Sequence, residues 1–490
     1  MFYEDDGDLG SRYISNKGVG MKFLLIYPPP EQFFIKNSYV FYGLSPPLGL
    51  LYIAKMLEND GDTVTVLDFS AEPFDEHKLI TAVSKVESVG VTVLSSSLNK
   101  VKSLIRLIKN NNPDIPLIIG GPHCSLLPEK TLEETQADVC VQGDGELVIE
   151  KIKQSLNMKK DYSKIPGIVY RTTSGIQHGS PQELINDLNS IPFPARHLVK
   201  HYVYGREYNP RLKAGEFTSI VTSRGCPYSC RFCSRGAISM QRYRKRSTEN
   251  IIAELKEIQQ QRYRHVAFAD DCFPTNTKQA HHLFDAIINE NFDLKFSITA
   301  SRVDLVDLEL YKKMRLAGVT HIQFGLESGN QDVLNFYHKQ TTIELIKKAV
   351  HMSHESGFFT MGSFIFGAPF ETTQHFNRTL LLAKSLPLDS ASFLPLRYMI
   401  GSELWNQAVN DKKIGGKEYL VSADRNRGLG MYTKEELIRY CINAQRSFYG
   451  RPTFFINLLK TSLRNNDMTY VQSYLSIILS SFRNSFFKNK

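Results

Sequence analysis

Three cysteines lie close together in the stretch FTSIVTSRGCPYSCRFC, which begins at Phe217. Cys226, Cys230 and Cys233 have the spacing C-x3-C-x2-C and follow an apolar segment that predicts a strand ending at Ser223. A [4Fe-4S] cluster is normally held by four cysteine thiolates, so three thiolates leave one iron without a protein ligand. A substrate or cofactor can bind at such an open metal position. The spacing therefore predicts a reactive [4Fe-4S] cluster with these cysteines as its metal ligands and catalytic residues.

A zinc site and three free thiols are the alternatives. Structural zinc needs four ligands, usually in two separated pairs, but Cys272 is the next cysteine and has no partner at a suitable spacing. Three of the seven cysteines fall within eight residues, which packing alone does not explain. The other four are scattered and give no support for a second cluster or a disulfide framework.

A C-x3-C-x2-C motif after a strand resembles the signature of the radical S-adenosylmethionine superfamily. The resemblance implies that the amino and carboxylate groups of S-adenosylmethionine bind the open iron. It also implies that one electron from the cluster cleaves the sulfonium and produces a 5′-deoxyadenosyl radical. Phe232 matches the aromatic position that lies near the adenine in this family.

Length and composition indicate a folded chain with more than one core. The chain has 490 residues, of which 42% are hydrophobic and 22% charged. No run of eighteen apolar residues occurs and the N-terminus, MFYEDDGDLG, lacks a secretory pattern, so we expect a cytoplasmic protein. We divide it into a flexible extension (1–20), a Rossmann-like domain (21–160), a connector (161–205), a partial barrel (206–430) and a helical basic region (431–490).

The net charge of +9 would suit nucleic acid, anionic lipid or an anionic cofactor. One basic block is Arg242, Arg244, Lys245 and Arg246, and a second follows Arg451. Neither block has the aromatic-rich pattern of a nucleic-acid module, so no nucleic-acid partner is expected. We favour a solvated basic face for each block.

The first 160 residues alternate apolar segments with helical periodicity, which indicates a parallel sheet with helices on both faces. Ligands bind at the carboxyl ends of such strands. Glycine turns occur there, at Gly120-Gly121-Pro122-His123 and Gly143-Asp144-Gly145-Glu146, and either could be no more than a tight turn. The expected strands are Lys22–Pro30, Asp62–Phe69, Val89–Ser95, Pro116–Ile119 and Ala137–Val141.

Together with the cysteine motif, these turns are similar to the N-terminal domain of cobalamin-binding radical S-adenosylmethionine enzymes. The resemblance implies that the serine and double-glycine loops house the nucleotide tail and that the corrin faces the cluster. The D-x-H-x-x-G motif of other cobalamin proteins is absent, so no histidine is assigned as an axial ligand. The implied cobalamin-binding residues are Ser95, Ser96, Gly120, Gly121, Gly143, Gly145 and Glu146.

From Phe217 onward the strand and helix alternation occurs six times, which predicts an incomplete barrel of the TIM type. The expected strands are Phe217–Ser223, His265–Asp271, Lys295–Ser301, His321–Glu327, Thr360–Phe366 and Ala391–Leu396. Carboxylates, an arginine and glycine turns follow these strands and are suitable partners for S-adenosylmethionine. By resemblance, Asp270 binds the amine, Arg302 the carboxylate, Glu327 and Ser328 the ribose, and Gly367 lies at the adenine. The family's glycine-glycine-glutamate motif is replaced by Ala269-Asp270-Asp271.

After Arg397 the regular pattern fades into helical segments. Phe448-Tyr449-Gly450-Arg451-Pro452 resembles a tail motif of the branch that contains anaerobic magnesium-protoporphyrin monomethyl ester cyclases and hopanoid-biosynthesis enzymes. The segments Phe454–Leu463 and Tyr470–Phe486 are amphipathic and basic. We favour a helical cap over the barrel mouth, and the alternative is a helix that lies in the inner membrane surface.

The expected activity is cobalamin-dependent radical methylation of an unactivated carbon. Ring closure, oxygen insertion or carbon-carbon coupling on a tetrapyrrole or lipid is the second hypothesis, and a non-catalytic cobalamin or nucleic-acid sensor is the third. The resemblance also implies a small-molecule or lipid substrate and a low-potential electron donor such as flavodoxin or ferredoxin. The sequence does not identify the substrate.

Overall fold

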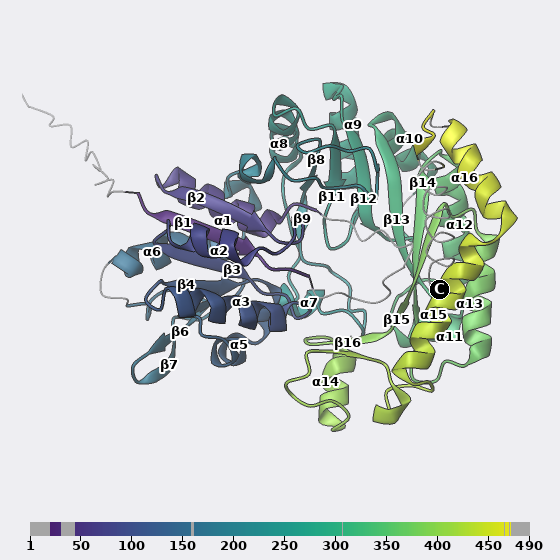
Figure 1. Ribbon diagram of the computed structural model, residues 1–490. Helices are drawn as coiled ribbons and strands as arrows, with labels where there is room; N and C mark the ends of the chain where they lie inside the picture. Colours follow the sequence, from purple (N-terminus) through teal and green to yellow (C-terminus); the bar gives the residue numbers. More distant parts are fainter. Residues whose placement is uncertain are drawn as a thin grey trace, which may run out of the picture.

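The computed structural model describes residues 20–30, 45–157, 161–305, 307–464, 466–469 and 471. The expected extension, except Gly20, and the tail segment Tyr470–Phe486, except Val471, lie outside these residues. Two large sheets dominate the described chain and lie side by side, each covered by helices (Figure 1).

The first sheet has seven strands in the order β2-β1-β3-β4-β5-β6-β7. Its first five strands are parallel, as the alternating pattern predicts, and the β6–β7 hairpin adds two antiparallel strands at the β5 edge. This hairpin falls in the segment expected as a connector, so the sheet continues beyond residue 160. The strands are β1 Lys22–Tyr27, β2 Thr63–Asp68, β3 Ser88–Thr92, β4 Leu117–Gly120, β5 Val139–Val141, β6 Ile168–Thr172 and β7 Gly175–His178.

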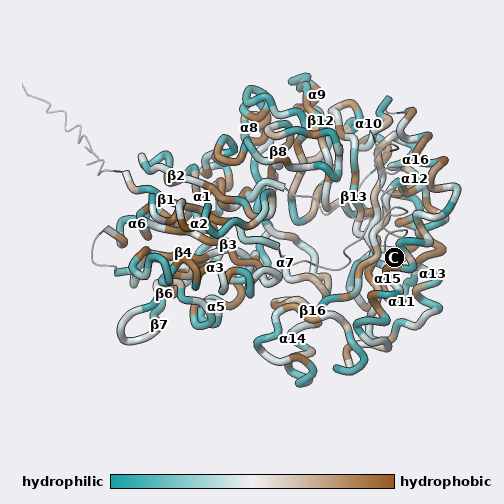
Figure 2. The backbone as a smooth tube through the Cα atoms, viewed as in Figure 1, coloured by the Kyte–Doolittle hydropathy of each residue, from teal (hydrophilic) through white to brown (hydrophobic). Residues whose placement is uncertain are grey.

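Helices cover this sheet because their apolar stripes face it. In α3, for example, Val101, Leu104, Ile105 and Ile108 are buried at helical spacing. Figure 2 shows hydrophobic residues along the strands and the adjoining parts of these helices. The helices are α1 Leu48–Asn59, α2 Glu76–Val83, α3 Leu98–Asn111, α4 Pro122–Leu126, α5 Pro128–Glu134 and α6 Ile149–Asn157.

The second sheet has six parallel strands in the order β15-β14-β13-β12-β11-β8, which confirms the incomplete barrel. Its strands are β8 Phe217–Ile220, β11 His265–Phe268, β12 Lys295–Ser301, β13 Val319–Glu327, β14 Phe359–Phe366 and β15 Ser390–Pro395. The outer helices are α8 Thr248–Gln260, α9 Thr277–Glu290, α10 Leu308–Leu316, α11 Gln331–Phe336, α12 Ile343–Glu355 and α13 Thr373–Ser385. The N-cap of α8 is Ser247, whose side chain accepts from the Asn250 N–H.

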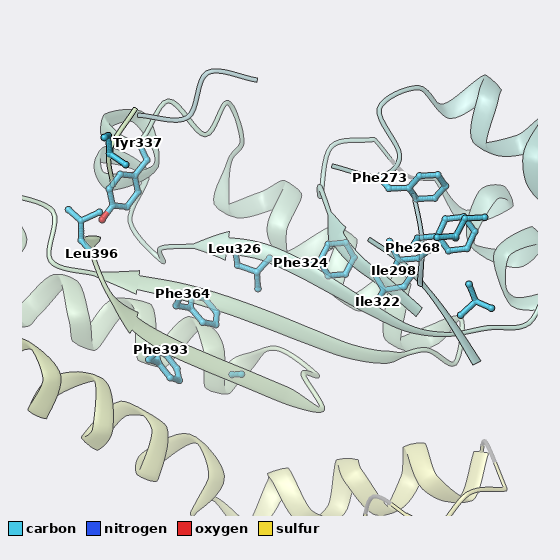
Figure 3. Close-up of a cluster of buried hydrophobic side chains, with 14 of the residues drawn as sticks. Phe268, Phe273, Ile298, Ile322, Phe324, Leu326, Tyr337, Phe364, Phe393 and Leu396 are labelled. Atoms are coloured by element: carbon cyan, nitrogen blue, oxygen red, sulfur yellow. The ribbon is translucent and has the colours of Figure 1, made fainter. Parts of the chain in front are cut away.

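Aromatic and aliphatic side chains fill the barrel core (Figure 3). Phe268, Phe296 and Phe324 are fully buried, and the rings of Phe364 and Phe393 stack with centroids 5.2 Å apart. His321, near the start of β13, packs against Phe359, which begins β14. That end of the barrel is opposite to the carboxyl ends of the strands.

Further strands and helices complete the second half of the chain. They are β9 Ser223–Arg224, α7 Arg235–Ile238, β10 Arg244–Lys245, β16 Arg397–Met399, α14 Glu403–Asn410, β17 Leu420–Ser422, α15 Lys434–Tyr449 and α16 Pro452–Arg464. Helices α15 and α16 pack along the outside of the barrel (Figure 1). Within the described part of the chain, no helix is long and apolar enough to cross a bilayer.

Candidate active site

The three motif cysteines follow β8 and β9 in one short loop. All three are half-buried, and the Cys233 N–H donates to the Cys230 carbonyl at 3.0 Å. Gly225, just before the motif, has a φ of +87°, and a Cβ there would lie 2.1 Å from the Arg242 carbonyl oxygen. The loop can therefore turn against β10 only with glycine at this position.

The thiols suit a cluster better than a single ion. Among the described residues, no group of three or more His, Cys, Asp or Glu side chains could hold one metal ion. In a [4Fe-4S] cluster each thiolate binds a different iron, so the sulfurs need not converge on one point. Three unpaired cysteines in one partly accessible loop fit this group, and their role as ligands stays a prediction.

Cys272 lies beside the motif, although the sequence places it 39 residues after Cys233. A hydrogen bond with the Cys272 thiol lowers the pKa of Cys226 to about 6. The sequence spacing gives Cys272 no partner for a zinc site, but the fold places its thiol against Cys226. Nothing in its spacing could reveal this contact, because it depends on β8 and β11 being neighbours in the sheet.

Asp270 is buried after β11 and anchors the segment that leads into the loop. Its carboxylate accepts from the Thr222 hydroxyl at 2.8 Å and from the Ser223 hydroxyl at 2.5 Å. Burial raises its pKa to about 6. Its neighbour Asp271 pairs with Arg235 at 3.0 Å and lines the cavity described below. The predicted contact of Asp270 with a methionyl amine stays a prediction.

Arg302, after β12, lies directly under the cysteine loop. Its guanidinium is 3.7 Å from the ring centroid of Tyr228, which stands between the first two motif cysteines. Asp304 accepts from Arg302 Nε at 2.9 Å, and the Lys339 carbonyl accepts from Nη2 at 2.9 Å. The structure thus brings Arg302, the residue predicted to bind the carboxylate of S-adenosylmethionine, to the loop, where it already has two hydrogen-bond partners.

Glu327 ends β13 with a φ of +60° and pairs with Lys339 at 2.7 Å. The Lys339 side chain is mostly buried, and the nearby Glu327 and Cys230 raise the pKa of its ammonium group against the effect of burial. Lys339 was not predicted from the sequence, because it follows α11 in a loop without a motif. Ser328 is buried within its own turn, where its hydroxyl accepts from the Asn330 N–H at 3.2 Å.

Phe232 contacts Tyr337 and Gly367 contacts Glu371, and both of these polar side chains are buried. The rings of Phe232 and Tyr337 meet edge to face with centroids 5.1 Å apart. The Gly367 and Ala368 N–H groups donate to Glu371 Oε2 at 2.7 and 2.8 Å. Tyr337 Oη and Glu371 Oε1 are buried polar atoms without a partner among the described residues. Unsatisfied buried polar atoms beside an aromatic ring fit a bound nucleoside.

A cavity of about 600 Å³ lies between the two sheets and is mainly apolar. Its walls include Gly120, Gly121, Gly143, Gly145 and Glu146 from the first domain. Arg224, Gly225 and Ala269 line it from the barrel side. A positive φ of +102° at Gly121, with its missing Cβ against Val93, makes a close backbone cradle.

Ser95 and Ser96 do not line this cavity. Ser95 Oγ instead contacts His123 Nδ1 at 2.9 Å, and burial lowers the pKa of His123 to about 4. The predicted contact of the serine loop with a nucleotide tail stays a prediction.

The basic block after the cysteine loop is only partly a solvated face. Arg242 and Lys245 are exposed, but Arg244 and Arg246 are buried and form ion pairs with Asp144 and Glu254, respectively. The expectation of a solvated face is therefore wrong for those two arginines, because partners from other elements neutralise them.

Comparisons with known proteins agree with this arrangement. The family description "Radical SAM superfamily" matches residues 220–383, and "B12 binding domain" matches residues 39–153. An uncharacterized methyltransferase of Pyrococcus horikoshii is 30% identical over 468 residues, covering 92% of this chain and 99% of the relative. The chain belongs to the cobalamin-binding radical S-adenosylmethionine enzymes.

Two further proteins are similar to this radical enzyme. The anaerobic magnesium-protoporphyrin IX monomethyl ester cyclase of Rubrivivax gelatinosus is 27% identical over 76% of this chain and 67% of the relative. The methyltransferase TsrM of Kitasatospora setae, solved with cobalamin and a [4Fe-4S] cluster, has a TM-score of 0.65 at 21% identity, covering 80% of this chain and 76% of that one. The cofactors of this enzyme are a [4Fe-4S] cluster, S-adenosylmethionine and cobalamin.

Proposed function

We propose that the enzyme methylates an unactivated carbon of a small organic substrate. The observation that carries this proposal is the cavity between the sheets, whose walls include the glycine turns of the B12 domain and Gly225 beside the cysteine motif. A corrinoid in this cavity would lie next to the cluster loop. The relatives of this chain include proteins named methyltransferases, which supports the same reaction.

The bound groups supply the chemistry: the cluster provides an electron for cleavage of the sulfonium, and the corrinoid provides a methyl carrier. The side chains of this chain bind and orient. We assign the cluster to Cys226, Cys230 and Cys233, and the carboxylate of S-adenosylmethionine to Arg302 with Lys339 beside it. Arg302 directly follows β12 and Lys339 lies in the loop after α11, so near the cysteine loop a carboxylate would find two charge-assisted partners.

The orphaned polar atoms indicate where the adenine would lie. Phe232 and Tyr337 offer an apolar wall, and Tyr337 Oη and Glu371 Oε1 offer hydrogen bonds to an adenine edge. Gly367 keeps the backbone close, since its φ is +114° and a Cβ would lie 2.7 Å from Leu437. These contacts would hold the nucleoside still while its sulfonium stays exposed to the cluster.

Isotope labelling tests methylation. The reconstituted enzyme is reduced without oxygen and incubated with hydroxocobalamin, methyl-deuterated S-adenosylmethionine and acceptors from three classes: tetrapyrrole, lipid and peptide. We expect deuterated methylcobalamin, 5′-deoxyadenosine and a deuterated methyl group in one acceptor. The Cys230→Ala variant should produce no deoxyadenosine.

The same assay separates the other hypotheses. Deoxyadenosine with an unlabelled, altered acceptor would support ring closure, oxygen insertion or carbon-carbon coupling, as the name of the Rubrivivax relative suggests. Absence of deoxyadenosine from cluster-loaded, reduced protein would support a sensor. We also propose flavodoxin or ferredoxin as the physiological reductant, to be tested by replacing the chemical reductant with each protein.

A lipid surface is a second proposed partner, through helix α16. Phe454 and Leu458 of α16 are buried against the barrel, whereas Phe455, Ile456 and Leu463 are exposed on its outer face. Lys460 and Arg464 are exposed beside this apolar stripe, as in helices that lie on anionic membranes. In sedimentation with phosphatidylglycerol vesicles, the full chain should pellet with the vesicles. The double variant Ile456→Asp, Leu463→Asp should stay in the supernatant. Equal sedimentation of both would contradict this contact.

A further inference from the structure

Four charged side chains connect the B12 domain to the start of the cluster loop. Asp144 and Glu146 come from the turn after β5, and Arg224 and Arg244 come from the paired strands β9 and β10. Arg224 Nη1 is 2.9 Å from Asp144 Oδ1, and Arg224 Nη2 is 2.6 Å from Glu146 Oε1. Arg244 also pairs with Asp144 and donates to the Ile185 carbonyl at 2.8 Å.

These pairs are shielded from solvent, so they hold their geometry. The side chains of Asp144, Glu146 and Arg244 are each less than 10% exposed, and that of Arg224 is 19% exposed. Burial alone would raise the pKa of Asp144, but the two arginines hold it below its ordinary value. Removing one partner from such a buried pair is strongly destabilising, because the other charge is left alone. The four residues thus form one rigid ionic cluster.

Arg224 joins this ionic cluster to the cysteine motif by two short routes. Only Gly225 separates it from Cys226, and the turn at Gly225 packs closely, since a Cβ there would lie 2.1 Å from the Arg242 carbonyl oxygen. Ser223, on its other side, donates to Asp270 at 2.5 Å. The guanidinium also lies 5.2 Å from the ring centroid of Tyr52, in α1 of the first domain. A shift of the guanidinium must therefore move the backbone that carries the first cysteine.

The same side chains line the cavity between the sheets. Asp144, Glu146, Arg224 and Arg244 all contribute to its wall, next to Gly143 and Gly145. A ligand that fills the cavity must therefore contact the ionic cluster or restrict it. Occupancy of the cavity and the position of the cluster loop then depend on one set of ion pairs.

We propose that Arg224 is a positioning residue that couples corrinoid binding to the geometry of the [4Fe-4S] cluster loop. Coupling of this kind is reciprocal: if the corrinoid stabilises the loop that holds the cluster, the cluster must raise the affinity for the corrinoid by the same factor. The inference needs both cofactors but does not depend on methyl transfer. Failure of the labelling assay would leave it intact.

The test measures hydroxocobalamin binding by absorption, without oxygen, to the full chain with and without its cluster. For the wild-type protein we expect the dissociation constant to fall about fivefold or more when the cluster is present, in the usual range for coupled sites. The Arg224→Gln variant should bring this ratio close to one. Arg224→Lys should give an intermediate ratio, because lysine keeps the charge but cannot bridge two carboxylates as a fork.

Arg231→Gln is the matched control. Arg231 lies inside the cysteine motif, but its side chain pairs with Glu403 at 2.6 Å and donates to Gln407 and the Phe336 carbonyl, none of which belongs to the B12 domain. The Arg231→Gln variant should keep the wild-type ratio of the hydroxocobalamin dissociation constants measured with and without the cluster. The electron paramagnetic resonance spectrum of the reduced cluster gives a second readout: added hydroxocobalamin should change it in the wild type and in Arg231→Gln, but not in Arg224→Gln. A wild-type affinity ratio of one, or an unchanged ratio in Arg224→Gln, would overturn the proposal.

Discussion

The ammonium group of Lys339 lies 2.7 Å from Glu327 Oε1 near Cys230, and the side chains of Lys339 and Glu327 are only 12% and 7% exposed, respectively. The two groups come from the end of β13 and from a loop twelve residues later. Removing either partner would leave a buried charge, so this pair contributes to both the fold and the charge balance near the cluster.

Replacing Lys339 with Met should lower the free energy of unfolding by about 3–5 kcal/mol, the usual cost of isolating a buried charge. Lys339→Met with Glu327→Gln should recover part of this loss, since neither side chain then carries a charge. Urea denaturation of the four proteins forms a double-mutant cycle. Additive losses would show that the two residues do not interact.

Replacing Cys230 with Ala should abolish cluster assembly, because only two of the motif thiolates remain. Iron and sulfide content should fall to the background of unreconstituted protein. Cys441→Ala is the control, since Cys441 is buried in α15 away from the loop. If Cys230→Ala keeps a full complement of iron and sulfide, the proposed ligand set is wrong.

Gly121→Ala should weaken both folding and hydroxocobalamin binding. Its φ of +102° is unfavourable for alanine, and the new Cβ would lie 3.2 Å from the Val93 carbonyl oxygen. Gly120→Ala is the matched control at the next residue, where the nearest atom is Val141 Cβ at 3.8 Å. Thermal unfolding and absorption titration should separate the two variants, and equal effects would argue against a backbone cradle at Gly121.

Stability should fall as pH rises from about 4.5 to 7 because of Glu371. Burial raises its pKa from 4.5 to about 7, so in this window the folded protein keeps a proton that the unfolded chain has lost. Glu371→Gln removes this titration and should flatten the profile. The expected difference between the two profiles reaches roughly 3 kcal/mol above pH 7, at about 1.4 kcal/mol per pKa unit.

Urea denaturation of cluster-free protein at several pH values measures this effect. Glu344→Gln, at an exposed position in the first turn of α12, serves as the control and should keep the wild-type slope. A Glu371→Gln profile parallel to that of the wild type would show that the carboxyl group does not titrate in this window.

Both sheets were predictable from the sequence because their signals are local. Apolar runs of strand length recur between helical periods, and the spacing of the three cysteines needs no structure to be read. Lys339 could not be found in this way, since a lone lysine in a loop carries no pattern. The contact of Cys272 with Cys226 and the pairing of Arg224 with Glu146 also lay beyond the sequence. They join segments 46 and 78 residues apart, and only the packing of strands and domains brings them together.

The walls of the large cavity come from two different sheets, and each sheet alone would present only an open surface there. Under the proposed function, a corrinoid in this cavity would therefore join the two halves of the molecule as well as carry the methyl group. If a related enzyme lost this cofactor, residues on both walls of the cavity would have to change together, or the two walls would have to close on each other.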